Sequence, residues 1–159
     1  MALRPKASVV PFVVHGTGTG VAQHLVVPGS PHAFRTDAYP AFGGADADPS
    51  PLLYLLGALT SCNQVTAQLV AKDLGITLGR MAFEVQGDLD TVVMVNGEDG
   101  NANFERVAVT AAVQTEASPE QFEALRRETE RRCPVTQMFI RSGLDFSSMW
   151  TQMPLTADV

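Results

Sequence analysis

Hydrophobic side chains near the start of the chain gather in two short runs separated by glycine and threonine. Residues 7–16 and 20–27 are rich in β-branched side chains, and the sequence GTGT at 16–19 lies between them. Because β-branched residues favour strands and glycine favours turns, this stretch predicts a hairpin with its turn at 16–19. The sequence PGSP at 28–31 predicts a further turn, and a short extended piece completes an N-terminal β-hairpin region over residues 7–36.

A long helix is predicted over residues 51–73. Ser50 is a suitable N-cap, Pro51 suits the first helical position, and Gly75 supplies the stop. The first half of this segment is apolar on every side, so we expect protein to surround it. Polar residues join the apolar ones in the second half, which predicts that the helix emerges toward solvent as it proceeds.

The remaining elements predicted from the pattern are a β-hairpin over residues 76–117, helices at 119–132 and 134–142, and a last strand at 145–152. Apolar residues alternate with polar or small ones in 81–86 and again in 107–114, which is the period of a half-buried strand. Ser118 and Gln121 form the pattern of a capping box at the start of the first helix. Pro134 separates the two helices, since the residue before a proline avoids the α conformation.

Together these elements predict a single α+β domain over residues 1–159, with antiparallel sheets packed on a long buried helix. A helix that is apolar on all sides needs cover on two of them. The sheet can cover one side, and a second copy of the chain is a natural cover for the other. We therefore expect a homodimer.

Composition excludes several classes of partner. Hydrophobic residues make up 45% of the chain and charged residues 18%, as in a globular protein. The net charge of −6 argues against nucleic acid or an anionic membrane as a partner. The apolar run at 51–59 is too short to span a bilayer, and the N-terminus lacks a signal-peptide pattern. We expect a cytoplasmic protein, in which thiols are kept reduced.

Neither a metal nor another cofactor is predicted. The chain has two cysteines, Cys62 and Cys133, and they do not form a Cys-x-x-Cys pair. The three histidines all lie in the first quarter of the chain, far in sequence from either thiol, so no zinc-ligand spacing is present. Any chemistry of this chain is therefore expected to depend on its thiols.

Local sequence gives Cys133 the stronger argument for reactivity. Pro134 at the first helical position makes Cys133 the N-cap of the following helix, and Arg132 precedes it. The free N–H groups, the helix dipole and a nearby cation all favour a thiolate. The alternative is that Cys133 is a structural cap.

Cys62 lies in the middle of the predicted long helix, where no dipole end assists it. Burial alone makes a thiol inert, so Cys62 is either a small buried hydrophobic residue or part of a site. The polar residues around it, which need water or hydrogen-bond partners, favour a site. These residues are Thr60, Ser61, Asn63 and Gln64.

A series of motifs resembles the OsmC/Ohr family, the osmotically induced and organic hydroperoxide resistance proteins. The motifs are Gly43-Gly44, the acidic stretch Asp46–Asp48, Pro49–Leu52, Ser61-Cys62 at the end of an apolar stretch, and Cys133-Pro134-Val135. The resemblance covers about residues 8–153, and the predicted order of strands and helices agrees with it. It implies an OsmC-like fold and an intertwined homodimer with paired central helices and active sites at the subunit interface.

The resemblance also implies a thiol-dependent peroxidase. In the peroxidases of the family, the thiol on the central helix attacks an organic hydroperoxide and becomes a sulfenic acid. A second cysteine then closes a disulfide, and a dithiol such as a lipoyl group reduces it. This assigns attack to Cys62 and resolution to Cys133, the reverse of the order that local electrostatics favours, and we adopt the family's order.

The same peroxidases place an arginine in the N-terminal hairpin and a glutamate in the first turn of the central helix. The corresponding residues here, 13–27, include no arginine, and Leu52 stands at the glutamate position. The nearest replacement is Arg35, with Asp37 two residues later, and His15 and His24 are weaker candidates. Without a cation, Cys62 is expected to keep a pKa of about 8.5 or higher.

Two hypotheses follow for the function. The first is a peroxidase that reduces organic hydroperoxides through Cys62 and Cys133, with Arg35 as the candidate cation. The second is a dimer of the same fold that has lost this chemistry and binds a small apolar ligand or has a stress-related role. A structural interaction module unrelated to the family is a third alternative.

Overall fold

The computed structural model describes residues 9–156, and within them the chain forms two three-stranded sheets and four α-helices. This confirms the predicted α+β class. The chain divides at Pro51 into two compact units, which are described separately. The prediction of a single domain over residues 1–159 stays a prediction. Among the described residues, no helix has the length and apolar character needed to cross a membrane.

The first unit contains an antiparallel sheet in the order β1-β2-β3, with β1 at His15–Thr19, β2 at Ala22–Val26 and β3 at Ala33–Thr36. The predicted turn at 16–19 is wrong, because these residues lie within β1 and the chain reverses at Gly20 and Val21. Gly20 has a φ of 65°, which favours glycine. Gly18 instead lets β1 approach β2 closely, since a Cβ there would lie 2.1 Å from the Ala22 carbonyl oxygen.

The predicted first strand also began too early. Residues 9–14 of that run carry no strand, and residues 7 and 8 lie outside the described residues. The β-branched side chains at the end of the run are exposed, Val13 at 51% and Val14 at 48%. Strand propensity depends on packing against a neighbouring strand, and in this unit the ladder of β1 begins only at His15.

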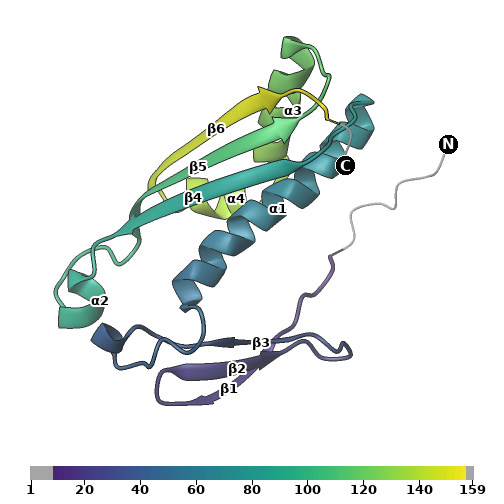
Figure 1. Ribbon diagram of the computed structural model, residues 1–159. Helices are drawn as coiled ribbons and strands as arrows, with labels where there is room; N and C mark the ends of the chain where they lie inside the picture. Colours follow the sequence, from purple (N-terminus) through teal and green to yellow (C-terminus); the bar gives the residue numbers. More distant parts are fainter. Residues whose placement is uncertain (1–8, 157–159) are drawn as a thin grey trace. The chain divides into compact units, whose positions relative to one another are not determined.

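In the second unit, Figure 1 shows α1 running along the sheet formed by the last three strands. The first unit also contains the short 3₁₀-helix η1 at Pro40–Phe42. The elements that follow it are α1 Pro51–Leu74, β4 Met81–Leu89, α2 Val92–Asn96, β5 Phe104–Gln114, α3 Pro119–Arg132, α4 Pro134–Arg141 and β6 Asp145–Met153. The predicted helix at 51–73 therefore begins at the expected residue and ends one residue later. Helix α2 was not predicted.

The second sheet has the order β4-β5-β6. The pairing of β4 with β5 is antiparallel, as the predicted hairpin over residues 76–117 requires. Strand β6 instead lies parallel to β5, with Arg106 opposite Asp145 and Gln114 opposite Met153. Helices α3 and α4 form the crossover that a parallel connection needs.

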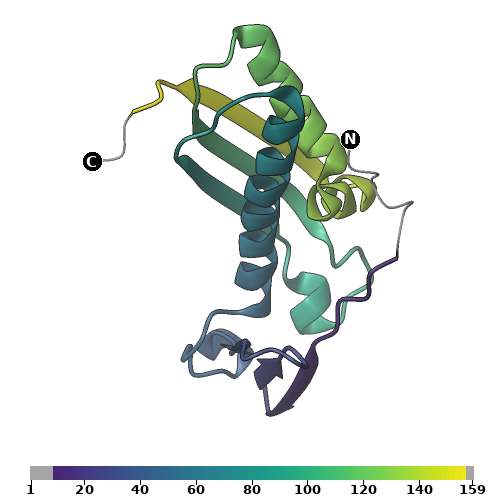
Figure 2. The same ribbon diagram turned by 90° about the vertical axis from the view of Figure 1, so that its right-hand side faces the viewer.

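The core lies between one face of this sheet and the helices. One cluster joins Leu56 and Leu59 of α1 to Val107 and Val109 of β5 and to Phe139 of α4. A second cluster joins Val70 and Ala71 of α1 to Leu125 of α3, with Trp150 of β6 packed against it. Figure 2 shows α1 lying across the face of the strands in this unit.

The expectation that α1 emerges toward solvent along its length is wrong, because both halves of the helix have a buried face. In its second half Ala67, Val70 and Ala71 are at most 2% exposed, because the sheet and α3 cover them. In its first turn Leu52 and Leu53 are 36% and 47% exposed. Val65 and Leu69 face outward although they are apolar, at 63% and 53% exposed. That a second copy of the chain covers the apolar first half stays a prediction.

The capping box of α3 is present: the Ser118 hydroxyl accepts the Gln121 N–H, and the Gln121 side chain accepts the Ser118 N–H at 2.9 Å. Replacing Ser118 with alanine is expected to lower the free energy of unfolding by about 1 kcal/mol, because an N–H of the first turn loses its acceptor. Urea unfolding of the reduced protein measures this loss. Ser118→Asp retains a capping oxygen and is the control, and an equal loss in both variants would contradict the explanation.

Candidate functional site

The two thiols are held by two different helices of the second unit. Cys62 lies within α1 and is partly buried, whereas Cys133 is 0% exposed. Cys133 is the N-cap of α4, as predicted, and its sulfur accepts the Thr136 N–H at 3.5 Å. Both cysteines are free.

The fold brings the thiols together, although they are far apart in sequence. Burial raises the pKa of the Cys62 thiol above its ordinary value. The backbone amide of Val135 opposes this by lowering the pKa, whereas the Cys133 side chain raises it further and the Thr66 side chain lowers it. Among the described residues, none of these groups carries a positive charge. The expectation that Cys62 keeps a high pKa without a cation agrees with this environment.

The thiols differ in their access to solvent. Cys62 is a partly exposed residue that a small molecule from solution can approach, whereas Cys133 is 0% exposed. The arrangement therefore suits a reaction that begins at Cys62 and continues at Cys133. This is the order that the family resemblance implies.

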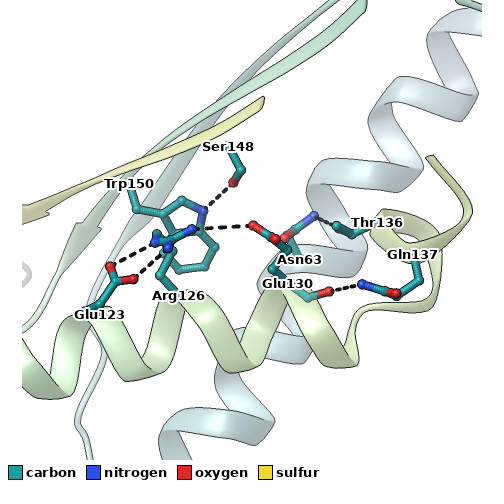
Figure 3. A network of polar contacts seen from close by, with 8 residues as sticks. All are labelled: Asn63, Glu123, Arg126, Glu130, Thr136, Gln137, Ser148 and Trp150. Atoms are coloured by element: carbon teal, nitrogen blue, oxygen red, sulfur yellow. Dashed lines mark hydrogen bonds and ion pairs between the residues drawn. The ribbon is translucent and has the colours of Figure 1, made fainter. Parts of the chain in front are cut away.

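The polar residues around Cys62 are mostly satisfied inside the chain. The hydroxyls of Thr60 and Ser61 donate to the Gly57 carbonyl oxygen at 3.0 and 2.9 Å, so these two side chains do not require an outside partner. Asn63 points inward, and its amide donates to the Thr136 hydroxyl at 2.9 Å (Figure 3). Sequence reasoning noted Asn63 but gave it no role, although a polar amide beside a thiol in an apolar helix was a usable signal.

The main candidate cation, Arg35, lies far from both thiols in the sequence and in another element. Arg35 is in β3 of the first unit and pairs with Asp48 at 3.4 Å, while its side chain is 69% exposed. Asp37 is not its partner, because the Asp37 carboxylate accepts the N–H groups of Ala38, Ala45 and Ala47 at 2.8–3.0 Å. These hydrogen bonds hold its pKa below the ordinary value, the one from Ala47 contributing most.

The other candidates are also engaged or exposed. Arg132, expected to favour a thiolate at Cys133, pairs with Asp73 at 2.8 Å, so a carboxylate neutralises its charge. His15 is in β1 and His24 in β2, and both are exposed. Within the described residues, no cluster of three or more His, Cys, Asp and Glu side chains has the arrangement needed to hold a metal ion.

The fold and the site define a class: an α+β protein with a pair of neighbouring thiols, one accessible and one buried. The family model for the OsmC-like protein matches residues 43–148, which is more than half of the chain. The chain therefore belongs to the OsmC-like family, and the resemblance inferred from its motifs is confirmed.

Solved structures with the same fold support this conclusion. An OsmC-like protein from Mycoplasma pneumoniae aligns with a TM-score of 0.76 at 18% identity, covering 91% of this chain and 98% of that one. An organic hydroperoxide resistance protein from Elizabethkingia anophelis aligns with a TM-score of 0.72 at 17% identity, covering 93% and 100%. The organic hydroperoxide resistance protein OhrB of Bacillus subtilis aligns with a TM-score of 0.61 at 18% identity, covering 91% and 100%. A search among curated proteins gave no match.

Proposed function

We propose that this protein reduces organic hydroperoxides with a two-thiol mechanism. The Cys62 thiolate attacks the terminal oxygen of the hydroperoxide, an S–O bond forms, the O–O bond breaks, and the substrate leaves as an alcohol after taking up a proton. Cys133 then attacks the sulfur of the Cys62 sulfenic acid, so that an S–S bond forms and water leaves. A dithiol reductant of the lipoyl type restores both thiols by exchange and becomes a disulfide itself.

The observation that carries this proposal is the contact between a partly exposed thiol and a fully buried one. The Cys133 side chain acts on the pKa of the Cys62 thiol, and the neighbouring Asn63 amide donates to Thr136 in the first turn of the helix that Cys133 caps. A peroxide molecule reaches Cys62 first, because Cys133 is 0% exposed. Chains matching the same fold include proteins described as conferring resistance to organic hydroperoxides.

An apolar hollow near the site favours an organic substrate over hydrogen peroxide. It has a volume of about 170 Å³ and is lined by Leu55, Asn103, Phe104, Met138, Phe139 and Ser142. Leu55 precedes Cys62 by seven residues, so both project from the same face of α1, about 10 Å apart along the helix axis.

Activation of Cys62 requires a compensating charge, since its environment raises its pKa. Arg35 is our candidate for this cation, and Cys62, Cys133 and Arg35 are the proposed catalytic residues. Its ion pair with Asp48 is largely exposed, and such pairs are weak, so the guanidinium can exchange partners at little cost. The proposal includes an intertwined homodimer and a cytoplasmic location.

The test is a stoichiometric reaction of the reduced protein with cumene hydroperoxide. We expect both thiols to be consumed and peptide mapping to find an intramolecular disulfide between Cys62 and Cys133. Hydrogen peroxide at the same concentration is the control and should react more slowly. If both thiols remain titratable after hours with excess hydroperoxide, the proposal is wrong.

A second candidate is a non-catalytic dimer that binds a small apolar ligand. The raised pKa of Cys62 and Leu52 at the position of the expected glutamate favour it. It predicts an apolar ligand retained through purification and no effect of Cys62→Ser on any function. Measuring the pKa of Cys62 in the dimer separates the candidates, since a value below about 7 favours the peroxidase.

A further inference from the structure

We propose that Asn63 is a positioning residue for the thiol pair. Through Thr136, it holds the N-terminus of α4, which carries Cys133, against the turn of α1 that carries Cys62. This inference rests on the proposed function, because only a function that joins the two thiols needs their separation fixed.

Asn63 is an unfavourable residue for its place unless its amide is used. Asparagine is a poor helix former, and a buried amide without hydrogen bonds is costly. Asn63 is 4% exposed, and its Nδ2 donates to the Leu59 carbonyl oxygen at 2.8 Å and to the Thr136 hydroxyl at 2.9 Å. Both N–H groups of the amide are therefore paired, one within α1 and one across to α4.

Thr136 connects this hydrogen bond to the second thiol. It lies in the first turn of α4, is 1% exposed, and its N–H donates to the Cys133 sulfur at 3.5 Å. The connections then form a closed ring: Cys62 is bonded to Asn63 in the chain, Asn63 to Thr136 by its side chain, and Thr136 to Cys133 by its amide. The ring closes where the Cys133 side chain meets Cys62.

A different hydrogen bond holds α4 to α3. Gln137 Nε2 of α4 donates to the Glu130 carbonyl oxygen of α3 at 3.0 Å, and this hydrogen bond fixes α4 to α3 (Figure 3). The Arg132–Asp73 ion pair and apolar packing also hold this helix pair to α1. The hydrogen bond from Asn63 is the polar contact that joins α1 to α4 next to both cysteines.

The consequence of such positioning is a high effective concentration of one thiol beside the other. A disulfide forms only when the two cysteines have a narrow range of separations, so fixing α4 against α1 favours closure. With oxidised glutathione the reaction is balanced as follows: the two thiols lose two protons and two electrons, the S–S bond forms, and the oxidant becomes two molecules of glutathione. Its equilibrium constant reports the positioning without any peroxide.

The experiment equilibrates the full-length protein with mixtures of reduced and oxidised glutathione and measures the fraction of Cys62–Cys133 disulfide by alkylation and mass spectrometry. Thr136→Val removes the acceptor of the Asn63 hydrogen bond. Asn63→Ser removes its donor but retains a hydroxyl that can bond to the Leu59 carbonyl, as Ser61 does to Gly57. Each is expected to lower the equilibrium constant about ten-fold, equivalent to about 30 mV.

Two controls separate positioning from ordinary stability. Thr136→Ser keeps the hydroxyl and should give the wild-type equilibrium constant. Thr115→Val removes a buried hydroxyl that donates to the Thr77 carbonyl oxygen at 2.7 Å in another part of the unit. It should lower the midpoint of urea unfolding of the reduced protein as Thr136→Val does, while leaving the thiol equilibrium unchanged.

The outcomes are distinguishable from failure of the proposed function. If the glutathione equilibria shift as expected while hydroperoxide consumes no thiol, positioning stands and the peroxidase does not. If hydroperoxide oxidises the wild-type pair but Thr136→Val and Asn63→Ser shift the equilibrium no more than Thr115→Val, the positioning role is overturned. It is equally overturned if the wild-type protein forms no intramolecular disulfide in any glutathione mixture.

Discussion

Replacing Cys62 with serine is expected to lower the rate of organic hydroperoxide reduction by about a thousand-fold or more, because a serine hydroxyl supplies no nucleophile of comparable strength. Replacing Cys133 with serine should leave the first oxidation intact and stop the reaction after one equivalent of peroxide. The difference arises because Cys62 is partly exposed and Cys133 is fully buried. Peroxide consumption with a dithiol reductant present measures the first effect. The second is measured without reductant, as a Cys62 sulfenic acid that accumulates where the wild-type protein forms a disulfide.

The two variants form a matched pair for this comparison. Both exchange sulfur for oxygen, and serine is itself a strong N-cap, so Cys133→Ser retains the first turn of α4. Dimedone labelling after one equivalent of peroxide should mark Cys62 in the Cys133→Ser protein and nothing in the Cys62→Ser protein. If dimedone instead marks Cys133 in the Cys62→Ser protein, the roles of the thiols are reversed.

If no cation reaches Cys62, the rate of the first oxidation step is expected to rise about ten-fold per pH unit, or about a hundred-fold in total, between pH 6 and pH 8. Only the thiolate attacks the peroxide, and burial raises the pKa of the Cys62 thiol above its ordinary value, so its thiolate fraction keeps growing through this range. Stopped-flow measurement with the Cys133→Ser protein isolates this step. A rate that is already constant above pH 7 would show that a cation lowers the pKa in the working protein.

The same raised pKa has a consequence for stability. Since the folded state binds the thiol proton more tightly than the unfolded state, the stabilisation is present below the ordinary thiol pKa of about 8.5 and is lost as the pH rises through the folded value. Cys62→Ser lacks this dependence. A comparison of the two unfolding curves at pH 7 and pH 10 therefore supplies an independent check on the direction of the shift.

Much of the second unit could be predicted because its boundaries are marked by residues with strong local preferences. Pro51 and Gly75 mark the ends of α1, and the Ser118 capping box marks the start of α3. The role of Cys133 as an N-cap also followed from the proline after it. These signals act over one helical turn, so one sequence is enough to detect them.

The features that were missed depend on distant contacts. The parallel pairing of β6 with β5 follows from the crossover of α3 and α4, which no local pattern reveals. The burial of Ala67 and Val70 follows from cover by other elements. The turn at Gly20 was misplaced because glycines also lie inside β1, where Gly18 allows the close approach of β2.

For the candidate site, sequence reasoning identified both thiols but derived their proximity only from family resemblance. Their 71-residue separation in sequence provides no spacing rule, and the contact exists because α4 lies against α1. The hydroxyls of Thr60 and Ser61 show the converse error, because they looked like a polar site and are satisfied by the helix backbone. An inward-facing Asn63 was the informative residue of that group.

The parallel crossover also leads us to expect an order of folding in this unit. Strands β4 and β5 are neighbours in sequence, whereas the 30 residues between Gln114 and Asp145 separate β5 from β6, so we expect β6 to join β5 after α3 and α4 have formed. Contacts between distant segments form late because their loops are costly to close. Cys133 lies within that late segment, so its meeting with Cys62 belongs to the last stage of folding. Disulfide formation under native conditions is therefore a marker of chains whose crossover is complete.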